Sequence, residues 1–177
     1  RINVDLANDY GNLLSRVTGM INKFQGGVVL DPAGAATEFD AELIAEAKET
    51  PARVAAFMDQ LDFASALAEV WKLIGKGNKY VDDTAPWALN RAGEKDKLAA
   101  VLYNICEILR MATVMITPVM PGVPQKVWQQ LNIVERPELQ TWDSLQFGLY
   151  PAGIEIKRAD PIFPRLDFAI LDEEAPA

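Results

Sequence analysis

Hydrophobic residues recur every three or four positions through most of the first 132 residues, and this spacing is typical of one buried face of an α-helix. The clearest stripe runs from Leu98 to Ile116 and ends at Thr117-Pro118, because the residue before a proline disfavours helical conformation. Further stripes predict helices over residues 4–24, from 37 onward, over 62–81 and through 127–131. Short connections between these segments predict an all-α fold, an antiparallel bundle of five to six helices.

Capping residues and prolines predict where these helices begin and end. Asp62 is suited to cap the helix that places Phe63 on its buried face. Thr50-Pro51 predicts a break in the preceding segment and the start of a new short helix, since proline is favoured in a first helical turn. Pro86 is predicted to end or kink the helix that follows Asp62.

The helical spacing fades after residue 132. We therefore predict a helical domain over 1–132, a mostly irregular tail packed on it over 133–170, and a frayed end over 171–177. Alternating side chains predict a short strand at 154–157. The tail is expected to pack because it contains many apolar side chains, namely Trp142, Leu145, Phe147, Ile162, Phe163 and Leu166.

The composition argues against most catalytic and metal chemistry. The chain has no histidine and one cysteine, Cys106, so it lacks Ser-His and Cys-His pairs, an internal disulfide and the ligands of a zinc site. It also lacks a glycine-rich phosphate loop. We expect Cys106 to fill apolar space in a protein of the reducing cytoplasm. No run of about twenty apolar residues predicts a membrane span.

The net charge of −8 argues against a protein that coats nucleic acid through bulk electrostatics, because that mode needs a positive field. This charge is compatible with a protein that binds nucleic acid through a small local site. Lys72, Lys76 and Lys79 form a stripe that no acidic residue interrupts, which predicts a positive face able to contact phosphates. A solvated helix face is the ordinary alternative for these lysines.

A polar row lies opposite the apolar stripe of the first predicted helix. Asn8, Asn12 and Arg16 follow one another at four-residue steps, so their side chains project in one direction. Asparagine offers a donor and an acceptor, and arginine offers a planar fork of donors, which together match base edges or phosphates. A solvated face, or amides bonded to a neighbouring helix, is the alternative.

Trp87 follows Pro86 at a predicted helix junction, where the fixed proline backbone leads directly into the indole. An exposed indole provides a stacking surface for an unpaired base, worth about 1–3 kcal/mol. The alternative is a tryptophan that fills the core, which is the role we predict for Trp71, Trp128 and Trp142. The nearby Asp82 and Asp83 are interpreted as ordinary surface carboxylates.

Several segments resemble one family in the same order along the chain. Residues 5–16 (DLANDYGNLLSR), 78–87 (NKYVDDTAPW) and 161–167 (PIFPRLD) are similar to the C-terminal part of methionyl-tRNA synthetases. Shorter matches lie between them at 20–23, 102–105, 117–121 and 141–146. The resemblance thus covers nearly the whole chain, and the segment that ends at Pro86-Trp87 is its most specific part.

This resemblance implies a helical anticodon-binding domain of the class I synthetase type. It implies that Asn8, Asn12, Arg16 and Trp87 contact the CAU anticodon, with the indole stacked under its first base. The expected partners are the tRNA for methionine and the catalytic domain of the full-length enzyme, with neither DNA nor a membrane. The catalytic domain would use ATP, and the resemblance leaves open whether it also holds zinc; no cofactor is expected in this chain.

The sequence departs from the family pattern in two respects. It contains neither the HIGH-type nor the KMSKS-type signature, so the catalytic domain is absent from these 177 residues and methionine activation is not expected on this chain alone. Gly75 and Gly77 stand where the family favours helix formers, which predicts a looser approach to Trp87. Two alternatives remain: the anticodon-binding domain of another class I synthetase, such as that for cysteine, leucine or isoleucine, and a helical protein-interaction module.

Overall fold

One apolar helix, α5 (Lys95–Ile116), forms the centre of the computed structural model, which describes residues 8–156 and 159–163. Every residue of α5 from Leu98 to Ile116 is buried, so the helix is enclosed on all sides. Within the described residues it is also the helix long and apolar enough to cross a membrane, with a mean hydropathy of 1.5. Because its apolar window is entirely buried inside the protein, α5 is a core helix.

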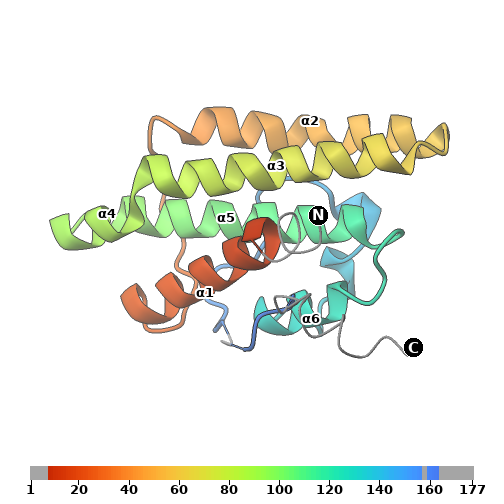
Figure 1. Cartoon of the computed structure of the whole chain (residues 1–177). Helices are drawn as coiled ribbons and strands as arrows, with labels where there is room; N and C mark the ends of the chain where they lie inside the picture. The colour runs from red at the N-terminus through yellow and green to blue at the C-terminus, as the bar shows by residue number, and fades with distance from the viewer. Residues whose placement is uncertain (1–7, 157–158, 164–177) are drawn as a thin grey trace, which may run out of the picture.

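The other helices surround α5 in layers (Figure 1). The antiparallel pair α2 (Asp40–Asp59) and α3 (Phe63–Thr84) covers one side, and α1 (Asn12–Phe24) with α6 (Pro124–Gln130) covers the other. The short helix α4 (Pro86–Ala92) extends beyond α3 at one end of the molecule. The predicted all-α antiparallel bundle is confirmed.

Several predicted helix boundaries are confirmed. The side chain of Asp62 caps α3 by accepting a hydrogen bond of 3.1 Å from the Ser65 amide. Hydrogen bonds from the Ser65 side chain and then from its amide lower the pKa of Asp62. Pro86 begins α4 after Ala85, whose φ of 44° turns the chain out of α3. α5 ends directly before Thr117-Pro118 as predicted.

The break predicted at Thr50-Pro51 is wrong, because α2 runs without interruption through both residues. Proline removes one amide donor from the helix, but tertiary contacts on either side hold the segment together. Arg53 pairs with Glu46 and, at 2.6 Å, with Glu69 of α3, so α2 is tied to its neighbour across the proline. The Thr50 hydroxyl also donates to the Glu46 carbonyl at 2.7 Å.

Three further predictions of burial or strand structure need correction. Phe63 is 50% exposed at the start of α3, and Trp142 is 40% exposed, so neither fills the core. Both lie at turns on the surface, where neighbouring helices do not cover them. At 154–156 the chain makes one isolated antiparallel bridge, between Glu155 and Val28, and no strand is assigned there; Lys157 lies outside the described residues.

The chain after α6 packs back on α5 through a buried polar clamp. Arg110, fully buried on α5, donates to the carbonyl oxygens of Leu139, Ser144 and Gln146 at 3.2, 2.8 and 2.9 Å. Its partner Glu107, 2.7 Å away, accepts the Tyr150 amide at 2.6 Å. The clamp satisfies backbone groups of two short 3₁₀ turns, η2 (Pro137–Leu139) and η3 (Trp142–Ser144), that would otherwise be buried without partners.

The division of the chain at residue 132 stays a prediction. Ile162 is buried and Phe163 packs against the core, whereas Leu166 and the predicted frayed end at 171–177 lie outside the described residues.

We expect Arg110→Met to lower the free energy of unfolding by about 3–5 kcal/mol, because it leaves the Glu107 carboxylate buried without its cation. Urea denaturation followed by circular dichroism measures the change. The matched control is Arg136→Met at an exposed position, where the loss should be about 0.5 kcal/mol or less. Equal losses in the two variants would contradict the proposed role of the clamp.

Candidate nucleic-acid interface

The polar row of the first helix lies on the surface. Asn8 and Asn12 are exposed and Arg16 is partly exposed, while Leu13 and Val17 of the same helix are buried in the core. Residues 8–11 are π-helical, and α1 begins at Asn12. Residues 4–7 lie outside the described part of the chain.

Helix α3 holds this row in place through two contacts. The Arg16 guanidinium bonds the Asp82 carboxylate at 2.6 Å, and the Asn78 amide donates to the Asp9 carbonyl at 3.2 Å. The Arg16–Asp82 pair is partly exposed, so it contributes little to stability. Its effect is to orient one edge of the guanidinium. Sequence reasoning missed both contacts, although Asn78 and Asp82 stand four residues apart and so share one side of α3.

Trp87 is the second residue of α4 and is 42% exposed, so it does not fill the core. The neighbouring Pro86 is buried, and Leu89 packs against the core, which fixes α4 while the indole reaches solvent. α4 contacts both α1 and α5. Since Asp82 lies in the last turns of α3, directly before α4, the structure brings Arg16 and Trp87 to the same end of the bundle.

The lysine stripe, in contrast, does not form the predicted positive face. Lys72 lies 3.4 Å from Glu46, and Lys76 lies 3.0 Å from Glu42 and 3.1 Å from Glu46, both carboxylates of α2. The hydrogen bond from Lys76 lowers the pKa of Glu42. Glu42 and Glu46 come from another helix, so the spacing along α3 did not reveal them; Glu69 and Asp83 of α3 itself also pair with Lys72 and Lys79. The role of these lysines as phosphate contacts stays a prediction, which the ion pairs disfavour.

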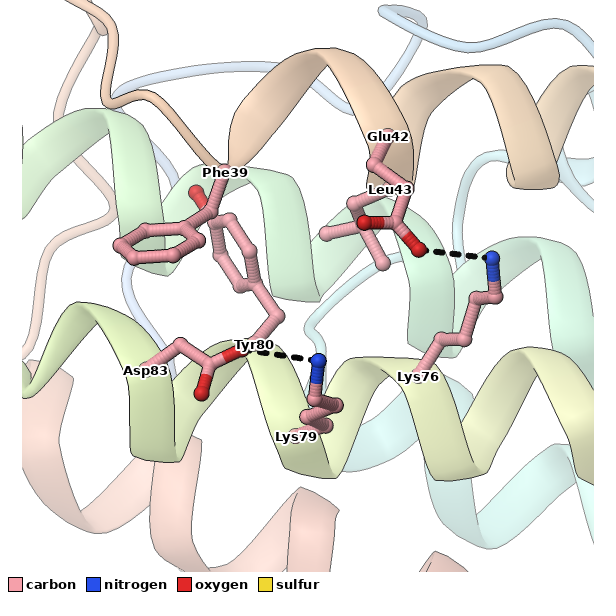
Figure 2. A pocket seen from close by; sticks show the side chains of 7 residues that line it. All are labelled: Phe39, Glu42, Leu43, Lys76, Lys79, Tyr80 and Asp83. Carbon is pink, nitrogen blue, oxygen red and sulfur yellow. Dashed lines mark hydrogen bonds and ion pairs between the residues drawn. The ribbon is translucent and has the colours of Figure 1, made fainter.

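Figure 2 shows the hollow beside this stripe, where Lys76 reaches Glu42 and Lys79 reaches Asp83 at 3.5 Å. Its volume is about 30 Å³, which is too small for a nucleotide. A larger and shallower hollow of about 380 Å³ adjoins it, with Phe39, Asp83, Leu89 and Lys97 among its lining residues. Within the described residues no group of three or more acidic, cysteine or histidine side chains is arranged to hold a metal ion.

The two glycines of α3 have opposite surroundings. A Cβ at Gly77 would lie 3.0 Å from Leu13 of α1 and 3.3 Å from Ile108 of α5, so this glycine permits the close approach of three helices. A Cβ at Gly75 would meet nothing within 4 Å. Gly77 therefore helps to set the position of the polar row on α1, whereas Gly75 carries only the helix-propensity cost of glycine.

Gly75→Ala should raise the free energy of unfolding by up to about 1 kcal/mol, since alanine favours the helix and enters open space. Gly77→Val should lower it by about 1–3 kcal/mol through overpacking against Leu13 and Ile108. Thermal and urea unfolding measure both, with Gly75→Val as the control for a branched side chain on α3. A well-tolerated Gly77→Val would show that α1 does not depend on this close approach.

The structure is thus a helical domain that exposes a row of amides and a guanidinium at its first helix and an indole on α4. These are the side chains that can bond the edges and stack on the faces of unpaired nucleotides. Residues 30–174 match the family model described as the anticodon binding domain of methionyl tRNA ligase. The chain therefore belongs to this family of anticodon-binding domains.

Individual relatives agree with this family. The methionine–tRNA ligase of Caldanaerobacter subterraneus subsp. tengcongensis is 46% identical over 168 residues, which cover 94% of this chain and 26% of the relative. The methionine–tRNA ligase of Bacillus subtilis is 39% identical over 168 residues, with 94% and 25% covered. The chain thus spans about a quarter of the length of these curated relatives.

Solved structures extend the similarity to three dimensions. Mycobacterium tuberculosis methionyl-tRNA synthetase in complex with methionyl-adenylate superimposes with a TM-score of 0.84 at 32% identity, covering 93% of this chain and 32% of that one. The apo form of the same enzyme gives a TM-score of 0.85 at 31% identity, with 94% and 34% covered.

Proposed function

We propose that this chain recognises the CAU anticodon of the tRNA for methionine, as one domain of a methionine–tRNA ligase that acts in the cytoplasm. The observation that carries the proposal is the exposed indole of Trp87 at the end of the bundle where Asp82 holds Arg16. Attachment of methionine with ATP would take place on the catalytic domain of the parent enzyme, to which this chain contributes binding.

In this proposal the polar row of Asn8, Asn12 and Arg16, at the start of α1 and in the π-helical residues before it, reads the edges of unpaired bases. The amides of Asn8 and Asn12 offer donor and acceptor pairs, and Arg16 offers the part of its guanidinium that Asp82 leaves accessible. Trp87 stacks on the face of an adjacent base. No covalent chemistry is required of these residues.

Preorganisation supports the proposal. α1 is held to α3 by Asn78 and Asp82, and α4 is held to the core by Pro86 and Leu89, so both parts of the site lie on anchored helices. Side chains held in place before binding lose less conformational entropy when the RNA arrives. A splayed anticodon loop would therefore bind side chains that already have their bound positions.

Trp87→Ala should weaken binding of a methionine anticodon hairpin by about 5- to 150-fold, the equivalent of losing a stacking contact of about 1–3 kcal/mol. Fluorescence anisotropy with a labelled hairpin measures the affinity, and circular dichroism verifies the fold. Trp142→Ala is the matched control, since that indole is 40% exposed and lies on η3, away from α4. Unchanged affinity in Trp87→Ala would remove the main support for RNA recognition.

Arg16→Gln should reduce the ratio of affinities for the CAU hairpin and a hairpin with an altered anticodon by about 5- to 150-fold, because a well-placed arginine contact discriminates by about 1–3 kcal/mol. The same titration performed with both hairpins measures this ratio. Arg136→Gln, an exposed arginine outside the site, serves as the control. An equal loss for both hairpins would instead assign Arg16 to a phosphate.

A further inference from the structure

The cations of this acidic protein fall into two groups. Most of those described are paired with carboxylates: Arg16, Arg53, Lys72, Lys76, Lys79, Lys97 and Arg110. Within residues 8–156, no ion pair with a carboxylate is found for Lys23, Lys48, Arg91, Lys95, Lys126 and Arg136. A ligand anion can bind a cation of the second group without displacing a carboxylate of the protein.

Two cations of this second group follow Trp87 closely in the sequence. Arg91 is exposed on α4, and Lys95 is exposed at the start of α5, directly after the turn at Gly93. We call this pair the basic corner. Residues 91–97 contain three basic residues and two acidic ones, Glu94 and Asp96, so the segment has a net charge of +1 in a chain of net charge −8. Glu94 is itself paired with Lys97 at 3.3 Å.

The spacing along α4 connects the corner to the indole. Arg91 follows Trp87 by four residues within one helix, so the two side chains project from the same side, one turn apart. Both are exposed. A nucleotide whose base stacks on Trp87 has its phosphate several ångströms away, within reach of the long side chain of Arg91. Lys95 extends the same positive surface onto the next helix.

We infer that the basic corner, Arg91 and Lys95, binds the phosphate backbone of the RNA strand next to the nucleotide that stacks on Trp87. The inference rests on the proposed function and assigns the backbone contacts to residues other than the lysine stripe of α3. Arginine and lysine at this position supply charge without reading sequence, since phosphates are identical along a strand. They would hold the strand in register while the polar row of Asn8, Asn12 and Arg16 reads the bases.

The test is a salt series of hairpin titrations with the whole chain and the double variant Arg91→Gln, Lys95→Gln. The affinity for the CAU hairpin and for an altered hairpin should fall by the same factor, about 10-fold at low salt. The slope of log affinity against log salt should shrink by about 1.4, or about 0.7 for each lost phosphate contact. Matched controls are Lys126→Gln on α6, far from α4 in Figure 1, and Lys76→Gln within the stripe.

Each outcome separates the two proposals. A wild-type chain that does not prefer the CAU hairpin over the altered one would remove the proposed function itself. A wild-type chain with that preference, and a double variant with unchanged affinity and salt slope, would overturn the basic corner alone. A larger loss of affinity in Lys76→Gln than in the double variant would assign the phosphate contacts to the lysine stripe of α3 instead. Loss confined to the CAU hairpin would make Arg91 or Lys95 a reader of bases.

Discussion

The complete enclosure of α5 is the constraint on which the remaining structure depends. A helix that is apolar on every side must be covered on every side, and the α2–α3 pair, α1, α6 and the chain after residue 132 each bury part of it. The charged residues Glu107 and Arg110 of this helix are compatible with burial because they pair with each other and satisfy backbone groups of the tail. The candidate RNA-binding side chains therefore lie on the outer faces of helices whose inner faces pack against the core.

The proposed site lies where several of these covering helices end together. α3 stops at Thr84, the left-handed Ala85 turns the chain, and α4 begins with a buried proline that carries the indole outward. α1 passes close to the same end because Gly77 allows Leu13 to approach α3. The position of the site is therefore a result of core packing, and the surface side chains refine its geometry through contacts such as Arg16–Asp82.

Patterns within one helix were predicted well from the sequence, whereas contacts between helices were not. The α5 stripe, the Asp62 cap and the junction at Pro86 each depend on neighbours only a few residues away, and all three are confirmed. The continuous helix through Pro51, the exposure of Phe63 and Trp142, and the carboxylates facing Lys72 and Lys76 all depend on which distant segment packs alongside. For the site, the spacing of residues predicted the polar row, and the position after Pro86 predicted the exposed indole. The contacts of Asp82 and Asn78 with this row could not be predicted, because they depend on the packing of the first helix against α3.

The ion pairs between α2 and α3 affect how a polyanion interacts with the flank of the domain, away from the proposed site. Along this flank a passing polyanion meets positive and negative groups in close alternation, so their fields cancel within a short distance in salt water. This flank therefore offers little net electrostatic attraction to an RNA backbone, which carries the same charge in every tRNA. Under the proposed function, weak attraction along this flank would limit non-specific RNA binding and so add to the selectivity of the site.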